Sequence, residues 1–562
     1  MMEFVAANLA PIMFGSVVFF LLSGFPVAFA LSACGLLFGF IGMELGLLHG
    51  TLFQALPLRV FGIMQNDILL AIPFFTLMGL ILERSGMAED LLDTAGQVFG
   101  PVRGGLAIAV IFVGALLAAT TGVVAASVIS MGLISLPIML RYGYSRPIAC
   151  GVITASGTLA QAIPPSLVLI VMADQLGRSV GEMYKGAFIP AFMLVGLYAL
   201  FVIGLAIFRP KMVPALPPEA IRYREPNGAS GLRSLVLFLS LIIGISVLFG
   251  AYYDNILGAL EGREVVTTLE EVVVIALTFG TALALLLAGL NRLLRLGLLS
   301  QIAERFTFVL VPPLALIFLV LGTIFLGIAT PTEGGAMGAL GAMLMALSRK
   351  RLDMLKLREA LESTTRLSVF VLFILIGATV FSFTFTAMDG KEWVEHLFDK
   401  LPGGQIGFLI FVNAVIFFLG FFLDFFEIAF ILIPLLAPVA EKLGIDLIWF
   451  GVMIALNLQT SFLTPPFGFA LFYLRSVAPV GAFIDRVTGK RTDGVKTTQI
   501  YRGSVAFVCI QVFMLALIIA FPELVTGNLD EKVKVDLDTI QIQAPPSDGG
   551  WGAPAGGDNG GW

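Results

Sequence analysis

The sequence predicts an all-α polytopic membrane protein with two inverted repeats, each holding a re-entrant helical hairpin and a discontinuous transmembrane helix. Of its 562 residues, 58% are hydrophobic and only 13% are charged, which is too little polar surface to coat a soluble globule. Helix-breaking residues also recur at one fixed spacing in the two halves, and the charges that flank them reverse in sign. We therefore expect lipid to solvate most of the surface.

Long stretches without charge identify the membrane spans as helices. Residues 4–43 and 104–140 contain no Asp, Glu, Lys or Arg and exceed the roughly 20 apolar residues that cross a bilayer as a helix. Membrane strands would instead show short alternating segments. Gly24 and Pro26 interrupt the first stretch, so it forms either one long tilted helix or two short ones. Besides two hairpins, we predict eleven crossings, centred near residues 24, 75, 160, 197, 244, 280, 318, 340, 377, 460 and 512.

The loops predict which side of the membrane each end of a helix faces. Cytoplasmic loops of membrane proteins carry an excess of Lys and Arg. Four loops contain between three and six basic residues each, and two other segments are net acidic. We expect the basic loops on the cytoplasmic side and the acidic segments on the other side. The basic loops are 209–233, 292–305, 349–366 and 475–502, and the acidic segments are 254–271 and 389–400.

A single offset of 301 residues aligns helix-breaking residues of the first half with those of the second. Chance matches of several such residues at one fixed offset are rare, so we interpret the pattern as an internal duplication. The aligned pairs are Pro101 with Pro402, Pro137 with Pro438, Gly143 with Gly444, and Pro164-Pro165 with Pro465-Pro466.

The charges at the ends of two aligned segments, 147–173 and 447–474, predict that the copies are inverted. The first segment follows a basic residue and precedes an acidic one, whereas the second has the opposite order. Under the positive-inside rule the first runs outward and the second inward, so the repeats have inverted topology. The flanking residues are Arg146 and Asp174 in the first copy, and Asp446 and Arg475 in the second.

The duplication divides the chain into four parts. The two copies are separated by a basic loop and an apparent extra helix pair, and an acidic tail rich in Gly and Pro, expected to be disordered, follows them. The parts are the first repeat over 1–210, the loop and helix pair over 211–306, the second repeat over 307–522, and the tail over 523–562.

Each copy contains a hairpin candidate. The segment 104–140 is too short for two crossings with a turn and too long for one, and its centre is polar at Thr120-Thr121-Gly122. A helix that enters, turns there and leaves on the same face fits this length. The alternative is one long tilted helix whose small residues pack against neighbours. We predict the second hairpin over 401–440, with Asp424 and Glu427 just past its centre.

Both discontinuous helices, 147–173 and 447–474, break near mid-span. Proline removes an amide donor and releases a carbonyl from the helix. Freed carbonyls beside Ser, Thr and Asn oxygens suit a hard cation such as Na⁺, and half-helix N-termini suit an anionic substrate. The alternative is a pair of proline kinks that neighbouring helices satisfy. The break residues are Ser156-Gly157-Thr158 through Pro164-Pro165 in the first, and Asn457 through Gln459-Thr460-Ser461 to Thr464-Pro465-Pro466 in the second.

Two further polar groups interrupt apolar runs. Asp424 and Glu427 are intramembrane carboxylates, which are costly in lipid and therefore functional by default. The alternative is a position near the aqueous edge of the membrane. The segment Thr330-Pro331-Thr332-Glu333 follows a long apolar run, and a structural turn and a functional role explain it equally well.

Enzyme signatures are missing from the sequence. His49 and His396 lie in predicted loops, and there is no P-loop or dinucleotide fingerprint. The cysteines Cys34, Cys150 and Cys509 lie in apolar segments without metal or redox spacing. We expect no enzymatic activity, no cofactor and no nucleic-acid partner. Energy for transport would then come from an ion gradient.

Four stretches resemble the large membrane subunit of tripartite ATP-independent periplasmic (TRAP) transporters, the DctM-like family. The resemblance covers most of residues 10–210 and 305–520. It implies a sodium-coupled, elevator-type importer in the bacterial inner membrane that receives carboxylates or similar organic acids from a periplasmic substrate-binding protein. It also implies a small four-helix membrane subunit as partner. The stretches are GFPVAFALSACG, GIATPTEGGAMGALGA, FFLDFFEIAFILIPLLAPVAEKLGID and GVMIALNLQTSFLTPPFG.

The resemblance also implies two sodium sites, one at each hairpin tip, with the substrate between the tips at Thr121 and Asp424. The first tip reads TTGVVAAS, where a tip rich in serine and glycine is commoner in the family. The implied ligands are Thr120, Thr121, Gly122, Ser156, Gly157 and Thr158 in the first site, and Asp424, Asn457, Thr460, Thr464 and Pro465 in the second.

The chain is longer than the usual large subunit. It adds a helix pair between about residues 232 and 300, a longer basic loop at 476–502 and the acidic tail. This layout looks most like the branch of the family associated with mannitol or chloroaromatic compounds. A second hypothesis is a divalent-anion sodium symporter of related fold that works without partners. A third, from another class, is a membrane scaffold or an intramembrane enzyme.

Overall fold

The computed structural model describes residues 4, 6, 8–223, 225, 230–261, 267–399, 402–485, 489, 491–527 and 529. This part of the chain is almost entirely helical. Two short strands, β1 (Phe483–Ile484) and β2 (Arg491–Thr492), pair antiparallel with Phe483 opposite Thr492. The predicted disorder of the tail falls mainly outside the described residues, and the start of that segment forms α25 (Glu523–Thr526).

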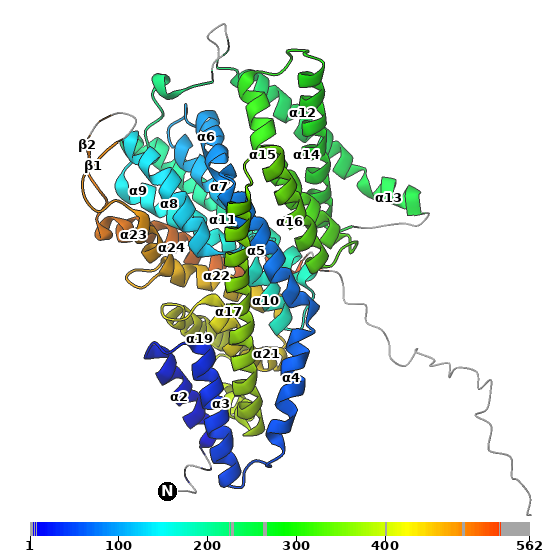
Figure 1. The fold of residues 1–562 in the computed structure, drawn as a ribbon, viewed down its shortest axis with the longest axis vertical. Helices are drawn as coiled ribbons and strands as arrows, with labels where there is room; N and C mark the ends of the chain where they lie inside the picture. Colours follow the sequence, from blue (N-terminus) through cyan, green and yellow to red (C-terminus); the bar gives the residue numbers. More distant parts are fainter. Residues whose placement is uncertain are drawn as a thin grey trace, which may run out of the picture. The chain divides into compact units, whose positions relative to one another are not determined.

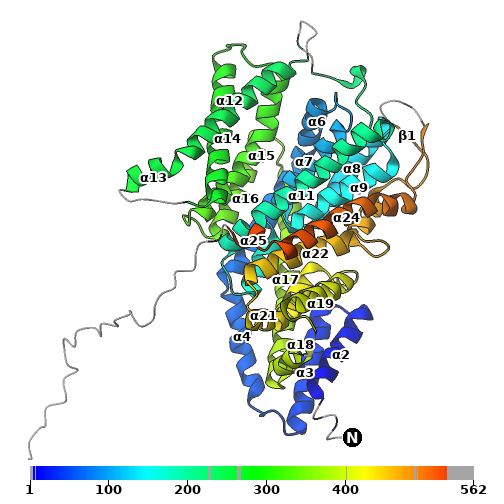
Figure 2. The same ribbon diagram turned by 180° about the vertical axis from the view of Figure 1, so that it is seen from behind.

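The helices form two sets with an insertion between them (Figures 1 and 2). Eight described helices are long and apolar enough to cross a membrane, or up to ten if each of two bent pairs is one span.

The first set is α2 (Leu9–Leu22), α3 (Val27–Glu44), α4 (Leu56–Met64), α5 (Ala71–Arg84), α6 (Met87–Phe99), α7 (Gly105–Thr121), α8 (Val124–Arg141), α9 (Arg146–Thr158), α10 (Leu167–Gln175) and α11 (Val180–Phe208). The insertion is α12 (Leu232–Ala251), α13 (Tyr253–Glu261) and α14 (Leu269–Leu293). The second set is α15 (Gln301–Phe325), α16 (Pro331–Ser348), α17 (Met354–Ala387), α18 (Gly390–Asp399), α19 (Gly404–Leu419), α20 (Phe425–Ile431), α21 (Ile433–Lys442), α22 (Leu447–Leu463), α23 (Phe469–Val477) and α24 (Thr497–Ala520). Short 3-10 turns are η1 (Leu52–Ala55), η2 (Asp67–Leu70), η3 (Leu159–Gln161), η4 (Pro210–Met212) and η5 (Pro218–Ala220).

The uncharged stretch at the start of the chain is two helices, not one. The chain leaves α2 at Ser23 and re-enters a helix at Val27, and α2 and α3 lie side by side. The rings of Phe20 and Phe25 pack edge to face across this turn, with centroids 5.6 Å apart. Residue 24, the predicted centre of a single crossing, is therefore the turn between two helices.

The two sets are inverted repeats, and the starts of two pairs of helices correspond. α8 begins at Val124 and its counterpart α20 begins at Phe425, while α9 begins at Arg146 and α22 at Leu447, so both pairs of starts are 301 residues apart. The offset that aligns the prolines thus also aligns the helices. The inserted helices α12 and α14 account for the predicted extra pair.

Helices of one repeat pack against helices of the other. α9 lies against α24 and α22 against α11, and in the same way α3 lies against α17 and α16 against α5 (Figures 1 and 2). Glycine permits these close approaches: a Cβ built on Gly377 of α17 would lie 2.5 Å from the carbonyl oxygen of Ala28 in α3, and one built on Gly338 of α16 would lie 2.6 Å from the Met78 sulfur of α5. The glycine-rich family stretches therefore form helix contacts between repeats.

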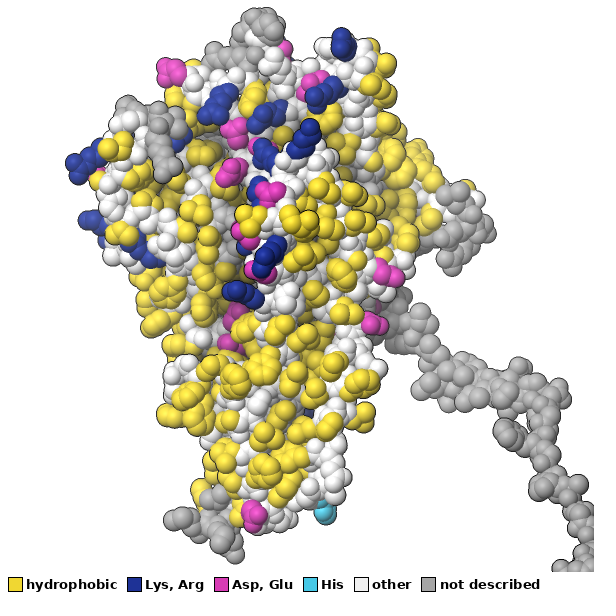
Figure 3. Space-filling model, viewed as in Figure 1, with side chains coloured by type: hydrophobic (Ala, Val, Ile, Leu, Met, Phe, Trp, Pro, Cys, Tyr) yellow, Lys and Arg dark blue, Asp and Glu magenta, His cyan; other side chains and the backbone are white. Residues whose placement is uncertain are grey.

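Ion pairs connect the predicted cytoplasmic loops to one end of the molecule. Asp90 of α6 bonds Arg351 at 3.0 Å, Asp93 of α6 bonds Arg305 at 3.2 Å, and Arg141 at the end of α8 bonds Asp485 at 2.6 Å. In Figure 3, basic side chains gather over the upper half of the molecule, and the lower half is mainly hydrophobic. The ion pairs thus join three of the predicted cytoplasmic loops to α6 and α8.

Candidate functional site

The first hairpin turns at its predicted polar tip. α7 ends at Thr121, Gly122 adopts the left-handed conformation with a φ of 60°, and α8 begins at Val124. The alternative of one long helix over 104–140 is therefore wrong. The hydroxyls of Thr121 and Ser127 form a hydrogen bond of 2.8 Å across the turn, which closes the tip.

Two other helices hold this tip in place. A Cβ built on Gly79 of α5 would lie 2.5 Å from the Thr120 carbonyl oxygen, and one built on Gly122 would lie 2.8 Å from Cγ of Leu167 at the start of α10. Since any larger side chain would collide, both glycines mark places where backbones touch. The tip is thus fixed between α5 and the second half of the first discontinuous helix.

The first discontinuous helix breaks between α9 and α10, at the predicted Pro164-Pro165. Because proline has no amide hydrogen, the carbonyls of Ala160 and Gln161 lose their helical donors. The Ser166 hydroxyl takes their place, at 2.8 Å from the Ala160 oxygen and 3.1 Å from the Gln161 oxygen. The break is fully buried, so its stability depends on this side chain.

The structure brings the first tip and the first break together. A Cβ built on Gly157 would lie 3.1 Å from the backbone nitrogen of Val128 in α8, and one built on Gly114 of α7 would collide with Ser156. Both legs of the hairpin therefore contact the end of α9. The residues predicted for the first sodium site lie in adjacent elements.

The hydroxyls of this site donate their protons locally. Thr120, Ser156 and Thr158 each donate to a carbonyl of their own helix, at distances of 2.9, 2.6 and 3.0 Å. A hydroxyl oxygen that donates in this way keeps its lone pairs as acceptors. All three side chains are buried, so their lone pairs are available to a dehydrated cation rather than to bulk water.

The second hairpin turns between α19 and α20, and carboxylates shape its tip. Asp424 caps α20, where its Oδ1 accepts from the Phe425 amide at 2.6 Å, and the Glu427 carboxylate accepts from the Asp424 amide at 2.8 Å. This reciprocal capping satisfies two helix N-terminal donors. Glu427 is 9% exposed and therefore buried in the protein, whereas Asp424 is half-buried.

The second tip also contacts its own break. A Cβ built on Gly420 would lie 2.8 Å from Oγ of Ser461 in α22, and the rings of Phe422 and Phe467 pack with centroids 5.5 Å apart. The chain leaves α22 at Thr464 and resumes in α23. Tip and break therefore meet in the second repeat, as they do in the first.

The predicted ligands of the second sodium site do not all bond one another. The Thr464 hydroxyl donates to the Thr460 carbonyl at 2.7 Å, but the Asp424 carboxylate bonds its own helix and not these threonines. Asn457 donates to the Asn413 carbonyl at 2.8 Å and so connects α22 to α19. Thr464 and Pro465 are half-buried, which makes this break more open than the first.

Several residues of this region were not predicted. Ser127 closes the first tip, Ser166 holds the first break, and Asn413 joins the second hairpin to α22. Glu83 of α5 accepts a hydrogen bond from Ser130 of α8. Ser127 lies in the quoted TTGVVAAS, so its position shortly after the tip was a usable signal. The Ser166 contact is also local, whereas the contacts of Asn413 and Glu83 depend on tertiary packing.

The polar segment that follows α15 has a structural role. Thr330 and Glu333 form a capping box at the start of α16, with the Thr330 amide donating to Glu333 at 2.8 Å. The Thr332 hydroxyl donates to the Asp67 carbonyl at 2.5 Å, which joins α16 to the turn before α5. These contacts explain the polar residues as helix capping.

Residues 14–310 and 299–524 match the family described as the tripartite ATP-independent periplasmic transporter, DctM component. The chain is 27% identical to a C4-dicarboxylate TRAP transporter large permease protein DctM of Pseudomonas aeruginosa, over 77% of this chain and 83% of the relative. It is 26% identical to the protein of the same name from Rhodobacter capsulatus, over 84% and 91%. It is 24% identical to the sialic acid TRAP transporter large permease protein SiaM of Vibrio cholerae, over 82% and 88%. A solved structure, the Alcanivorax borkumensis YdaH transporter, aligns with a TM-score of 0.47 and 14% identity over 84% of this chain and 88% of that one.

Proposed function

This chain belongs to the DctM component family of tripartite ATP-independent periplasmic transporters, and we propose that it couples the import of a small organic acid to the entry of sodium. It is a transport permease of the bacterial inner membrane and not an enzyme. The observation that carries the proposal is the paired arrangement in which each polar-tipped hairpin contacts the break of a discontinuous helix. Such breaks offer oxygen ligands at membrane depth.

The first sodium ion would bind at the first tip and break. The buried hydroxyls of Thr120, Ser156 and Thr158 keep free lone pairs, and the turn at Thr121 and Gly122 adds oxygens beside them. Oxygen ligands of this kind suit a hard monovalent cation. Gly157 permits the close approach of α8 to α9 that brings these oxygens together.

The second sodium ion would bind near Asp424, Thr460 and Thr464, where a carboxylate supplies the negative charge that the first site lacks. Asn457 would act mainly by positioning α22, and Pro465 by ending α22 beside these oxygens. Substrate would lie between Thr121 and Asp424. α10 contacts α20 and α22, so the two half-sites share a wall.

The substrate class follows from chemistry that the relatives' names share. Three relatives are named for C4-dicarboxylates, two for sialic acid and one for isethionate, all of which are organic acids. We extend this class to the present chain. The resemblance to the branch for mannitol or chloroaromatic compounds stays a prediction. The half-helix N-termini at the breaks would favour the anionic group.

Two partners complete the proposed system. A periplasmic substrate-binding protein would deliver the solute, and a small membrane subunit would assemble with the chain. The chain spans only 60% and 59% of two longer relatives, the isethionate permease DctMQ and the sialic acid permease SiaT. We attribute the remainder of those relatives to a fused small subunit, which here would be a separate chain.

Dependence on a binding protein distinguishes this proposal from a symporter that works alone. Proteoliposomes with the permease and its small subunit are expected to accumulate a labelled organic acid only when the cognate secreted binding protein is present. The expected increase is at least about tenfold, because the bound solute is presented at high effective concentration. Equal uptake of free solute without the binding protein would favour the stand-alone symporter.

A further inference from the structure

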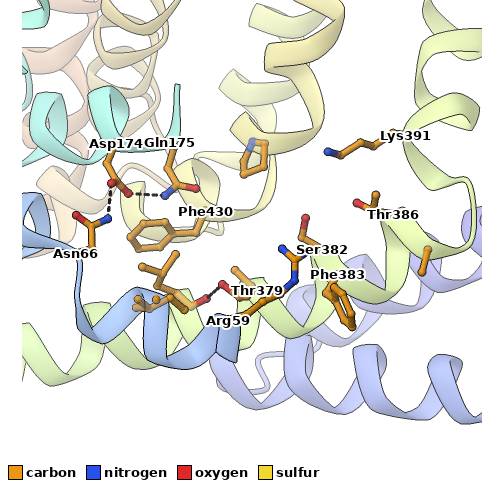
Figure 4. Close-up of a pocket in the computed structure, with 16 residues that line it drawn as sticks. Arg59, Asn66, Asp174, Gln175, Thr379, Ser382, Phe383, Thr386, Lys391 and Phe430 are labelled. Atoms are coloured by element: carbon orange, nitrogen blue, oxygen red, sulfur yellow. Dashed lines mark hydrogen bonds between the residues drawn. The ribbon is translucent and has the colours of Figure 1, made fainter. Parts of the chain in front are cut away.

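A cavity of about 700 Å³ opens between two groups of helices, away from the hairpin tips. The short helix α4 and the long helix α17 form one wall, and the end of α10, the second hairpin and α18 form the other (Figure 4). Neither Thr121 nor Asp424 lines it. Since a ligand cavity of roughly 300–1,000 Å³ suits a small molecule, this volume is sufficient for a small organic acid.

Two basic side chains enter this cavity from opposite walls. Arg59 reaches it from α4 and Lys391 from α18, and both point inward in Figure 4. Within the described part of the chain, neither has a carboxylate within ion-pair distance. The Arg59 guanidinium lies 4.7 Å from the centroid of the Phe383 ring, which orients it without neutralising its charge.

Among the described residues of the lining, the one carboxylate is already satisfied. Asp174 accepts from the Asn66 amide at 2.6 Å through one oxygen and from the Gln175 amide at 2.8 Å through the other (Figure 4). The bond from Asn66 joins α10 to the turn after α4. Neither basic side chain pairs with Asp174, so the lining carries the two positive charges of Arg59 and Lys391 against the one negative charge of Asp174 and keeps an excess of positive charge.

Hydroxyls on α17 add hydrogen-bonding capacity beside these charges. Thr379, Ser382 and Thr386 line the cavity at spacings of three and four residues, so they share one face of the helix. The Thr379 hydroxyl donates to the Leu375 carbonyl at 2.8 Å, so Ser382 and Thr386 supply the donors for a ligand. Ser382 is labelled next to the Arg59 guanidinium in Figure 4. Arginine, lysine and hydroxyl donors around one space are the groups that bind a carboxylate.

We propose that this cavity is a second binding site for a small organic carboxylate, distinct from the site between the hairpin tips. Arg59 and Lys391 would bind the carboxylate, and Ser382 lines the cavity beside them. The inference rests on the proposed import function. In that function the cavity, between α17 and the second hairpin, would bind the acid before the acid reaches the site between the hairpin tips. Acidic segment 389–400 contains Lys391, which places the cavity toward the side from which a binding protein delivers solute.

Thiol chemistry measures the charge of the cavity without any transport step. In a Cys509→Ser background, Ser382→Cys supplies a reactive thiol, since Cys34 and Cys150 are buried. The rates of modification by an anionic and a cationic methanethiosulfonate reagent are compared on the reconstituted complex. Replacing Arg59 and Lys391 by Gln is expected to lower the anionic-to-cationic rate ratio at least about tenfold, because the local potential falls.

A substitution on the same long helix is the matched control. Arg358 of α17 pairs with Glu362 at 2.8 Å and does not line the cavity. Arg358→Gln is expected to leave the rate ratio of the introduced thiol unchanged. If the Ser382→Cys protein gave the same ratio with and without the Arg59→Gln and Lys391→Gln changes, the proposal that these side chains charge the cavity would be overturned.

Protection experiments on the Ser382→Cys protein identify the ligand. The probes are acetate, lactate and succinate, tested in phosphatidylcholine nanodiscs with and without phosphatidylglycerol. A bound carboxylate is expected to slow modification about fivefold at about four times its Kd, because free sites fall as one plus the ratio of ligand to Kd. Protection should vanish when Arg59→Gln and Lys391→Gln are added. No protection by any of the three acids overturns the carboxylate assignment, and protection by phosphatidylglycerol alone assigns the cavity to lipid headgroups.

These outcomes are separate from the test of the proposed function. If carboxylates protect the introduced thiol but uptake needs no binding protein, the cavity assignment stands and the tripartite import proposal fails. If uptake needs the binding protein but no carboxylate protects this thiol, the import proposal stands and the cavity assignment fails.

Discussion

Asp424→Asn is expected to reduce sodium-driven uptake at least about a hundredfold. This factor corresponds to about 2.7 kcal/mol of the free energy that couples sodium binding to substrate uptake. The change keeps an N-cap acceptor for the Phe425 amide, so α20 should form normally. It removes the negative charge that a sodium ion needs at membrane depth. Uptake is measured in proteoliposomes as a function of sodium concentration, and thermal stability is measured on the same preparation.

A second N-cap aspartate provides the matched control for this change. Asp353 caps α17 by accepting from the Lys356 amide at 2.8 Å, far along the chain from both hairpins. Asp353→Asn is expected to leave uptake near the native rate. Full uptake by Asp424→Asn would remove this carboxylate from the sodium site.

Gly122→Ala is expected to lower uptake at least about tenfold by displacing the first hairpin tip. The residue has a φ of 60°, and an added Cβ would lie 2.8 Å from Cγ of Leu167. The left-handed conformation alone costs a residue with a side chain about 1–2 kcal/mol. The clash with α10 adds to this cost and shifts Thr120 and Thr121, which are predicted ligands.

Gly297→Ala separates these two effects. Gly297 has a φ of 65°, and a Cβ built on it meets nothing within 4 Å. The Gly297→Ala variant therefore has the cost of the left-handed conformation without a clash against another helix. Stability should fall further in Gly122→Ala, which adds the clash with α10 to the conformational cost, and uptake should fall only in that variant. Equal loss of uptake in the two variants would contradict a functional role for the contact between the tip and α10.

The repeat could be predicted closely because proline and glycine act locally. The offset of 301 residues, found from pairs such as Pro164-Pro165 and Pro465-Pro466, also separates the first residue of α9 from the first residue of α22. The sequence could not decide whether residues 4–43 form one helix or two. Gly24 and Pro26 permit either form, and the packing of α3 against α17 favours the turn.

The candidate site was predicted in part. Thr120, Thr121, Gly122, Ser156 and Gly157 come together because tip and break are adjacent in the same repeat. The Ser166 contact with the freed carbonyls was missed, although proline chemistry requires a substitute donor there. Its counterpart in the second repeat is Phe467, which has no hydroxyl, so comparison of the two copies offered no signal.

The cavity could not be predicted, because its groups come from distant parts of the chain. Arg59, Asp174 and Lys391 lie on α4, α10 and α18, and no periodic pattern links them. Each appears in the sequence as an ordinary polar residue near the end of an apolar segment. Only the packing of α4 and α17 beside the second hairpin places the two basic groups around one space.

The cation dependence of uptake tests the central claim most directly. Proteoliposomes that contain the permease, its small subunit and its binding protein are loaded with potassium and diluted into sodium or into potassium at equal ionic strength. An inward sodium gradient is expected to raise the initial rate of organic acid uptake at least about tenfold, because binding of the ions is coupled to that of the substrate. Equal rates in sodium and potassium would contradict sodium-coupled import by this permease.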